Sequence, residues 1–273
     1  MRVALVQLAA DIDSAANREH ISTQLAGLTA DDALDLVVLP EASMHDFGAA
    51  DHDLAAAAEP LDGPFVQLIA AEARRLGTTI VAGMFERTGD DLPFNTLVAV
   101  GPDGSLRTTY RKIHLYDSFG YKESDRLLPG EIEPVVIDVA GRPVGLMTCY
   151  DLRFPELARE LVDAGAETLV VPAAWVAGDH KLDHWRTLLQ ARAIENTVHV
   201  VAAAQGGDRY TGHSLVADPW GSIVVEADSG SEILRADLAA DDVARTRDVN
   251  PSLANRRLAP PRPAASRKSS LPS

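Results

Sequence analysis

Cys149 is the only cysteine of the chain, and it stands in the stretch VGLMTCYDLRFPE, where an apolar run stops and charged residues begin. A thiol attacks an acyl carbon when a nearby base takes its proton and a positive donor meets the oxygen that becomes negative. Glu41 follows the apolar run LDLVVLP and Lys112 lies within LRTTYRKIHL, so their side chains suit these two tasks. The alternative is that Cys149 is only a small hydrophobe at the end of a strand.

The segments around these residues alternate between strands and helices. Short β-branched runs are separated by longer segments of helical period, a pattern typical of packed α and β layers. We expect strands at 2–8, 34–40, 78–86, 95–101, 106–115, 143–149, 167–175, 198–204, 212–227 (a hairpin turning at 219–221) and 232–238. We expect helices at 16–28, 64–77, 155–164 and 181–196. Cys149 then ends a buried strand, where α/β folds tend to display functional groups.

The chain is long enough to bury one large core, because it has 273 residues of which 46% are hydrophobic. Mixed strands separated by helices predict an α/β fold in which two β-sheets pack face to face and each is covered by helices, a four-layer αββα sandwich. We expect a single domain over residues 1–258. The end of the sequence, APPRPAASRKSSLPS, has no apolar period, so residues 259–273 are expected to form a disordered or loosely packed tail.

Charge and composition argue against several classes of partner. The formal net charge of −15 places the surface under a negative field, so we expect no nucleic acid partner. No apolar run approaches the ~20 residues needed to cross a bilayer, and we expect no membrane contact. The start, MRVALVQLAA, lacks the cleavage pattern of a signal peptide, and a lone cysteine excludes an intrachain disulfide framework. The expected compartment is the reducing cytoplasm.

The segments LVVLPE, YRKIHLYD and GLMTCYDLRFPELAR resemble the carbon-nitrogen hydrolase (nitrilase) superfamily, whose catalytic set is Glu, Lys and Cys in that order. The resemblance extends through FNTLVAVGPDGSL, ESDRLLPG, AETLVVPAAW, HWRTLLQARAIENTVHVVAAAQ and GHSLVADPWG, and covers roughly residues 1 to 260. It implies the same sandwich, with Glu41 as general base and acid, Lys112 as oxyanion donor and Cys149 as nucleophile. Glu123, in YKESDRLLPG, falls where the family often has a second glutamate that orients lysine and substrate.

This catalytic set implies hydrolysis of an amide. The Cys149 thiolate attacks the carbonyl, Lys112 and the backbone N–H of Tyr150 meet the oxyanion, and ammonia leaves with a proton supplied through Glu41. Water deprotonated by Glu41 then cleaves the thioester to a carboxylate. A thiol of pKa near ~8.5 is mostly protonated at neutral pH, so its neighbours must lower that pKa or accept the proton during attack. Neither a metal nor an organic cofactor is required.

Among the eight histidines, one pair is the best candidate for a metal site. His180 and His184 stand at i and i+4 in HKLDHW, but the glutamate of a zinc-protease HExxH motif is missing. We therefore interpret them as surface or pocket-edge histidines and predict no metal.

The substrate is predicted by a narrower resemblance. CYDLRFPELAR together with ARAIE, AAAQ and GHSLVADPWG resembles the branch that contains omega-amidase and deaminated-glutathione amidase, which act on amides that carry a carboxylate. Arg153 could bind that carboxylate as a bidentate partner, or it could form a structural ion pair with an acid such as Asp151. Trp175 and His184 are expected to line the pocket, although Trp175 could instead pack in the core.

Three functions remain open from the sequence. The favoured one is a thiol amidase of the omega-amidase or deaminated-glutathione type, which needs only a small-molecule amide and water. The second is nitrile or N-carbamoyl hydrolysis on the same scaffold. The third is a non-catalytic binding subunit, against which the complete set of Glu41, Lys112 and Cys149 argues.

The resemblance also implies a homodimer or a higher homo-oligomer, paired through helices. The helix that begins near Pro155 is the expected interface element. Its apolar residues recur at helical spacing, namely Leu157, Ala158, Leu161 and Val162. The alternative is that they serve the core of their own protomer.

Overall fold

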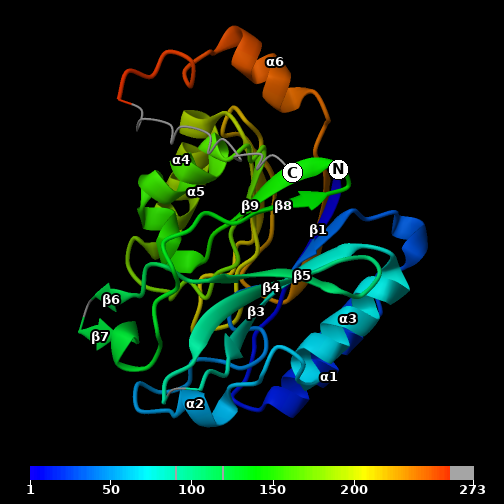
Figure 1. Cartoon of the computed structure of the whole chain (residues 1–273), viewed down its shortest axis with the longest axis vertical. Coiled ribbons are helices and arrows are strands. Elements are labelled where there is room, and N and C mark those ends of the chain that lie inside the picture. Colours follow the sequence, from blue (N-terminus) through cyan, green and yellow to red (C-terminus); the bar gives the residue numbers. More distant parts are fainter. Residues whose placement is uncertain (90, 119, 259–273) are drawn as a thin grey trace, which may run out of the picture.

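Two six-stranded mixed sheets form the centre of the protein in a computed structural model, which describes residues 1–89, 91–118 and 120–258 (Figure 1). The first sheet has the order β14-β1-β2-β3-β4-β5, and the second has the order β13-β12-β11-β10-β9-β8. The strands are β1 (Arg2–Gln7), β2 (Leu36–Val38), β3 (Thr79–Glu86), β4 (Phe94–Val100), β5 (Leu106–Arg111), β8 (Val136–Val139), β9 (Arg142–Leu146), β10 (Thr168–Val170), β11 (His199–Ala202), β12 (Leu215–Ala217), β13 (Ile223–Glu226) and β14 (Glu232–Asp237). The tail predicted at 259–273 lies outside the described residues.

Helices cover the outer faces of both sheets, as Figure 1 shows. The helices are α1 (Ser14–Leu25), α2 (Leu54–Ala57), α3 (Pro64–Leu76), α4 (Pro155–Asp163), α5 (Lys181–Asn196) and α6 (Asp242–Val249). Apolar residues of α1 and α3 pack on the first sheet, and those of α4 and α5 pack on the second. The predicted αββα sandwich is therefore confirmed.

The sandwich follows from strands that are apolar on both faces. Along β1, Val3 and Leu5 belong to the core between the two sheets, whereas Ala4 and Val6 belong to the core under α1 and α3. Alternate residues of a strand point to opposite faces, so a continuous apolar run buries both. At the centre of each sheet the strands are parallel: β1 with β2 and β2 with β3 in the first, β9 with β10 and β10 with β11 in the second.

Local signals set the bounds of the outer helices. Asp13 caps α1 by accepting hydrogen bonds from the backbone N–H groups of Ala15 and Ala16. Pro64 opens α3, and Gly77, with a φ of 64°, ends it in the left-handed conformation. These signals set where α1 begins and where α3 begins and ends.

Several predicted strands are too long. The strand expected at 167–175 ends at Val170, the one expected at 143–149 ends at Leu146, and the one expected at 106–115 ends at Arg111. The backbone of Lys112 still donates to the Asn95 oxygen, but the Lys112 oxygen accepts from the N–H of Gly130, which lies outside the sheet. The chain then forms a small hairpin, β6 (Asp117–Ser118) with β7 (Tyr121–Lys122), that the sequence pattern did not indicate.

The apolar residues of α4 serve the core of their own protomer. Leu157, Ala158, Leu161 and Val162 are all buried in the core of the second sheet. This observation removes them as the expected dimer contact.

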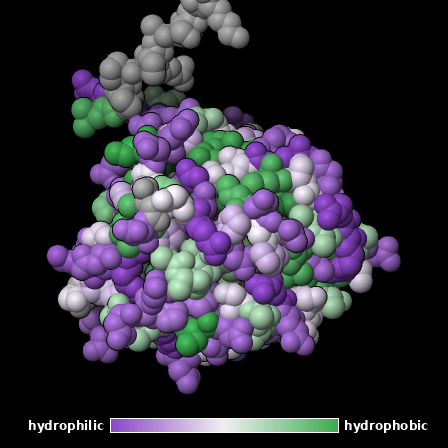
Figure 2. Space-filling model, turned by 60° about the horizontal axis from the view of Figure 1, so that its bottom comes forward, coloured by the Kyte–Doolittle hydropathy of each residue, from purple (hydrophilic) through white to green (hydrophobic). Residues whose placement is uncertain are grey.

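Figure 2 shows one face of the molecule, on which hydrophilic side chains predominate and hydrophobic ones gather in small groups. Within the described ranges, no helix is both long enough and apolar enough to span a membrane.

Candidate active site

Glu41 follows β2 and is fixed by a close approach of β3. A Cβ on Gly83 would lie 2.6 Å from the Glu41 Cα and 2.7 Å from the Ala42 nitrogen, so glycine lets β3 pass at this distance. Ala42 takes a φ of 56°, which turns the chain away from the strand. The Glu41 side chain is buried, and its Oε2 accepts a hydrogen bond of 2.6 Å from the N–H of Ala174, in the segment that follows β10 of the second sheet.

Cys149 follows β9 at the start of a 3-10 helix (Cys149–Arg153) and has a φ of 45°. A residue with a side chain is held in this left-handed region at a cost on the order of 1–3 kcal/mol, and such residues cluster at active sites. Its N–H donates to the Pro172 oxygen at 2.9 Å, which ties the turn to the segment after β10. The strained backbone directs the thiol into the cavity described below.

Lys112 joins two carboxylates. Its Nζ lies 3.0 Å from Glu41 Oε1, and 3.0 and 2.8 Å from the Oε1 and Oε2 of Glu123. The three side chains are almost fully buried. Glu123 also accepts a hydrogen bond of 2.6 Å from the Tyr116 N–H, so the base of the small hairpin carries this second glutamate to the lysine.

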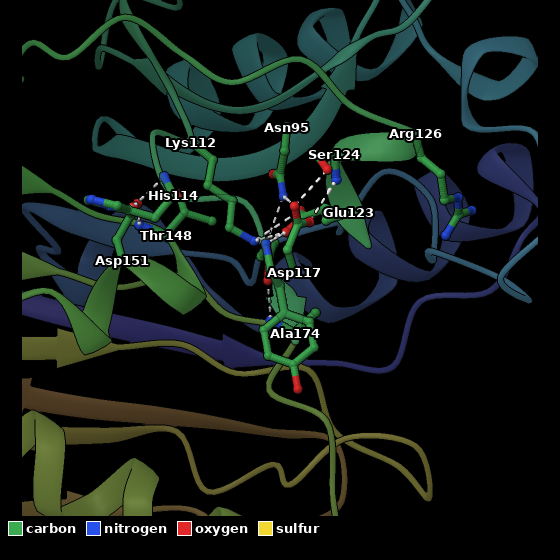
Figure 3. Close-up of polar contacts among 12 residues, drawn as sticks. Asn95, Lys112, His114, Asp117, Glu123, Ser124, Arg126, Thr148, Asp151 and Ala174 are labelled. Atoms are coloured by element: carbon green, nitrogen blue, oxygen red, sulfur yellow. Dashed lines mark hydrogen bonds and ion pairs between the residues drawn. The ribbon is translucent and has the colours of Figure 1, made fainter. Parts of the chain in front are cut away.

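Two further side chains hold this arrangement, and the sequence analysis did not single out either role (Figure 3). Asn95 donates from Nδ2 to Glu41 Oε1 at 2.7 Å and to Glu123 Oε1 at 3.2 Å. The signal that could have found Asn95 is its place in FNTLVAV, where a polar amide interrupts a strand of apolar residues.

Asp151 connects the nucleophile turn to the segment around Lys112. Its carboxylate accepts from the Thr148 N–H at 2.9 Å, the Tyr110 hydroxyl at 2.6 Å and the His114 N–H at 3.1 Å. The Asp151 carboxylate is therefore occupied by these partners, and it forms no ion pair with Arg153. The structural alternative for Arg153 is not observed.

Burial dominates the electrostatics of the site. Burial raises the pKa of the Cys149 thiol well above its ordinary value, the charge of Glu41 adds to the rise, and Lys112 opposes it. Burial alone would lower the pKa of Lys112, but Glu123 and Glu41 outweigh it and the net shift is upward. Burial also raises the pKa of Glu123, with partial opposition from Lys112. The resting thiol is thus protonated, and the ammonium is charged.

These residues open onto one cavity of about 310 Å³, which Glu41, Lys112, Glu123 and Cys149 all line. A cavity of this size accommodates a small molecule. The structure therefore brings together the four residues that the sequence analysis placed in the catalytic set.

The predicted substrate-binding residues lie around the same cavity with one exception. Tyr150, Arg153 and Trp175 line it, and the Arg153 guanidinium stacks 4.9 Å from the centre of the Trp175 ring. His184 is not among the lining residues. Its Nδ1 lies 3.5 Å from Arg153 Nη2, so it contacts a residue that lines the cavity.

Two cationic side chains of the cavity were missed from the sequence. Lys181, at the start of α5, places its Nζ 3.3 Å from the Tyr116 hydroxyl. Arg209 also lines the cavity and forms an ion pair with Asp46. The described part of the chain contains no group of three or more His, Cys, Asp or Glu side chains that could hold a metal ion.

Comparison with known proteins agrees with this geometry. The family model described as carbon-nitrogen hydrolase matches residues 2–248. A deaminated glutathione amidase of Escherichia coli O157:H7 is 39% identical over 246 residues, which cover 89% of this chain and 92% of that protein.

Two solved structures are close to this fold. A carbon-nitrogen hydrolase superfamily protein of Xanthomonas campestris with an arsenic adduct in its active site matches with a TM-score of 0.85 and 32% identity, over 94% of this chain and 97% of that chain. A mutant amidase of Nesterenkonia sp. AN1, with glutamine in place of a glutamate, matches with a TM-score of 0.79 and 26% identity, over 94% of each chain. That structure shows covalent addition of the acetamide moiety of fluoroacetamide at the active site cysteine.

The family match spans nearly the whole chain, and it falls on a fold and a buried Glu-Lys-Cys cluster that fit it. The chain therefore belongs to the carbon-nitrogen hydrolase family, resembles its deaminated-glutathione-amidase branch, and is a hydrolase of carbon-nitrogen bonds other than peptide bonds.

Proposed function

We propose that this protein is a cysteine-dependent amidase, which converts a small carboxylate-bearing amide to a carboxylate and ammonia through a thioester. The observation that carries the proposal is the convergence of Glu41, Lys112, Glu123 and Cys149 on one cavity. The covalent acetamide adduct on the cysteine of the Nesterenkonia amidase supports a covalent role for Cys149. A binding subunit without activity would have no need of this buried, charged cluster.

Acylation begins with a neutral thiol, because the pKa of Cys149 is raised by burial. Glu41 accepts the thiol proton as sulfur attacks the amide carbon, and the carbonyl oxygen becomes negative. Lys112 and the Tyr150 N–H stabilise that oxygen. Glu123 accepts from Lys112 through both oxygens, so one N–H of the ammonium can turn to the oxyanion while another still holds the carboxylate.

Collapse of this intermediate breaks the carbon–nitrogen bond. Glu41 returns its proton to the leaving nitrogen, ammonia departs, and the acyl group remains on sulfur as a thioester. Glu41 then deprotonates a water molecule, whose oxygen attacks the thioester carbon, and the proton passes back to the Cys149 sulfur as the carboxylic acid leaves. Each step uses only residues of this chain.

The preference for a carboxylate rests on local charge. The chain carries a formal net charge of −15, yet Arg153, Lys181 and Arg209 all line the cavity. Arg209 is already paired with Asp46. Arg153 stacks on Trp175, and within the described ranges its polar side-chain neighbour is the His184 ring rather than a carboxylate. Its guanidinium is therefore available to a substrate anion.

The test is ammonia release from a panel of small amides with and without a terminal carboxylate, matched nitriles and N-carbamoyl amino acids, with products identified by mass spectrometry. We expect turnover of carboxylate-bearing amides and trapping of an acyl adduct on Cys149. Turnover of nitriles or carbamoyl compounds alone would replace this proposal by the other reactions of the scaffold. Failure of every substrate, with no acyl adduct, would favour a non-catalytic subunit.

A further inference from the structure

Asn95, in β4, contacts three of the four residues proposed for catalysis. Its Nδ2 donates to Glu41 Oε1 at 2.7 Å and to Glu123 Oε1 at 3.2 Å. Its backbone oxygen accepts from the Lys112 N–H at 2.8 Å. Figure 3 shows the Asn95 amide directed at the same point as the Lys112 ammonium. One buried residue thus fixes the base, the second glutamate and the backbone that carries the lysine.

The orientation of the Asn95 amide follows from its partners. Both contacts are carboxylate oxygens, which accept and cannot donate while ionised, so the NH₂ group must face them. The other end, Oδ1, is buried without a hydrogen-bond partner in the described part of the chain. A buried acceptor without a partner is unfavourable, and Leu97, Val98 and Ala99 of the same strand are buried apolar residues. The unsatisfied oxygen is a cost that the site imposes on the strand.

The two carboxylates need this donor because one ammonium serves both. Glu41 Oε1 and Glu123 Oε1 both contact Lys112 Nζ at 3.0 Å, which brings two like charges together in a buried place. Like charges at such a distance favour protonation of one of the pair, whereas donors to the ionised form oppose it. Asn95 adds an N–H to each of the two oxygens.

We propose that Asn95 is a positioning residue that holds Glu41 and Glu123 on Lys112, so that the Glu41 carboxylate is placed to accept the Cys149 proton. The inference rests on the proposed function, in which Glu41 is the base. It predicts that removal of the Asn95 NH₂ group changes the pH at which the base works, and not merely the stability of the fold.

The readout is alkylation of Cys149 by iodoacetamide, followed by intact mass between pH 5 and pH 9, which needs no substrate to be known. The variants are Asn95→Leu, which keeps a similar volume without polar atoms, and Asn95→Asp, which keeps the shape and replaces the donor by an acceptor. The control is Thr96→Val, because the adjacent Thr96 hydroxyl donates at 2.8 Å to buried Glu86, away from the cavity. Thermal unfolding of each variant is measured in parallel.

In both Asn95 variants, we expect the alkylation rate to begin to rise at a pH higher by about one unit or more, because loss of a donor favours the protonated carboxylate. We also expect the maximal alkylation rate, reached at high pH, to be lower by roughly tenfold or more. Thr96→Val should keep the wild-type profile even where its melting temperature falls. An Asn95→Leu profile that coincides with that of wild type, or shifts no more than the Thr96→Val profile, would overturn the inference.

Glu41→Gln separates this inference from the proposed function. If Glu41 is the base, this variant should react far more slowly at neutral pH, and its rate should rise only at higher pH, as the thiol itself loses its proton. A Glu41→Gln profile identical to wild type would refute the proposed role of Glu41. Slow alkylation in Glu41→Gln combined with wild-type profiles in the Asn95 variants would refute the role of Asn95 alone.

Discussion

Substitution of Arg153 should decide whether the cavity selects carboxylates. Arg153→Ala removes the guanidinium that stacks 4.9 Å from the centre of the Trp175 ring, and Arg153→Lys keeps the charge but not the planar, bidentate geometry. The melting temperature should change little, because Arg153 is only partly buried and forms no ion pair with the described residues. The effect should therefore appear in catalysis rather than in folding.

The magnitude follows from the degree of burial. Loss of one partner of a buried, hydrogen-bonded ion pair costs about 2–5 kcal/mol in binding. Because Arg153 is partly exposed, solvent screens the pair, and we expect about 2–3 kcal/mol, which is roughly a 30- to 150-fold loss in kcat/KM. Arg153→Lys should lose less than Arg153→Ala, since a point charge still attracts the anion.

The assay compares two amides of equal length, one ending in a carboxylate and the other in a methyl group. The matched control is Arg186→Ala, which removes an arginine of α5 that pairs at 2.7 Å with Glu226 and does not line the cavity. Equal losses on both amides, or a similar loss in Arg186→Ala, would refute carboxylate selection by Arg153.

The other predictions concern the thiol, its supports and the assembly. Cys149→Ala should abolish turnover and leave the fold intact, as circular dichroism and ammonia release would show; activity near that of wild type would rule out the thioester. Burial raises the pKa of the Cys149 thiol in the folded protein, so the unfolded chain loses this proton first as the pH rises above about 8.5. Under reducing conditions, the unfolding free energy of wild type should therefore fall relative to that of Cys149→Ala, by about 1.4 kcal/mol per pH unit. Parallel pH curves in calorimetry would contradict this. Asp151→Asn, which turns an NH₂ group toward donors, should lower the unfolding free energy by about 2–4 kcal/mol in denaturant titration. We propose a homodimer that uses exposed apolar residues such as Ile194 and Trp220; a single species of 29.2 kDa in sedimentation at micromolar concentration would exclude it.

The sequence pattern was sufficient for residues whose position depends on one element. Cys149 and Glu41 each follow a short apolar run that becomes a buried strand, so their place at a strand end could be predicted. The bounds of α5 were predicted as well, because a helical period over 181–196 is a local property. Local pattern did not predict the end of the strand before Lys112, whose backbone oxygen accepts from the N–H of Gly130 outside the sheet.

Residues that act through tertiary pairing were not predictable in this way. Asn95 contacts Glu41 only because β2, β3 and β4 are neighbours in the first sheet. Glycine is required at position 83 only because the Glu41 backbone lies against it in the folded protein. His184 was expected at the cavity, but the direction of its side chain depends on how α5 begins after His180, which has a φ of 62°. No periodicity along the chain encodes such contacts.

The site depends on the contact between the two sheets. The base comes from the first sheet and the thiol from the second, and two hydrogen bonds cross between them: the Ala174 N–H to Glu41 Oε2 at 2.6 Å, and Gln205 Nε2 to the Glu41 backbone oxygen at 2.9 Å. These bonds fix Glu41 relative to the sheet that carries Cys149. Proton transfer requires the two groups within hydrogen-bonding reach, so even a small slide of one sheet would slow the reaction. The close-packed apolar layer between the sheets is thus part of what sets the rate, although it touches no substrate.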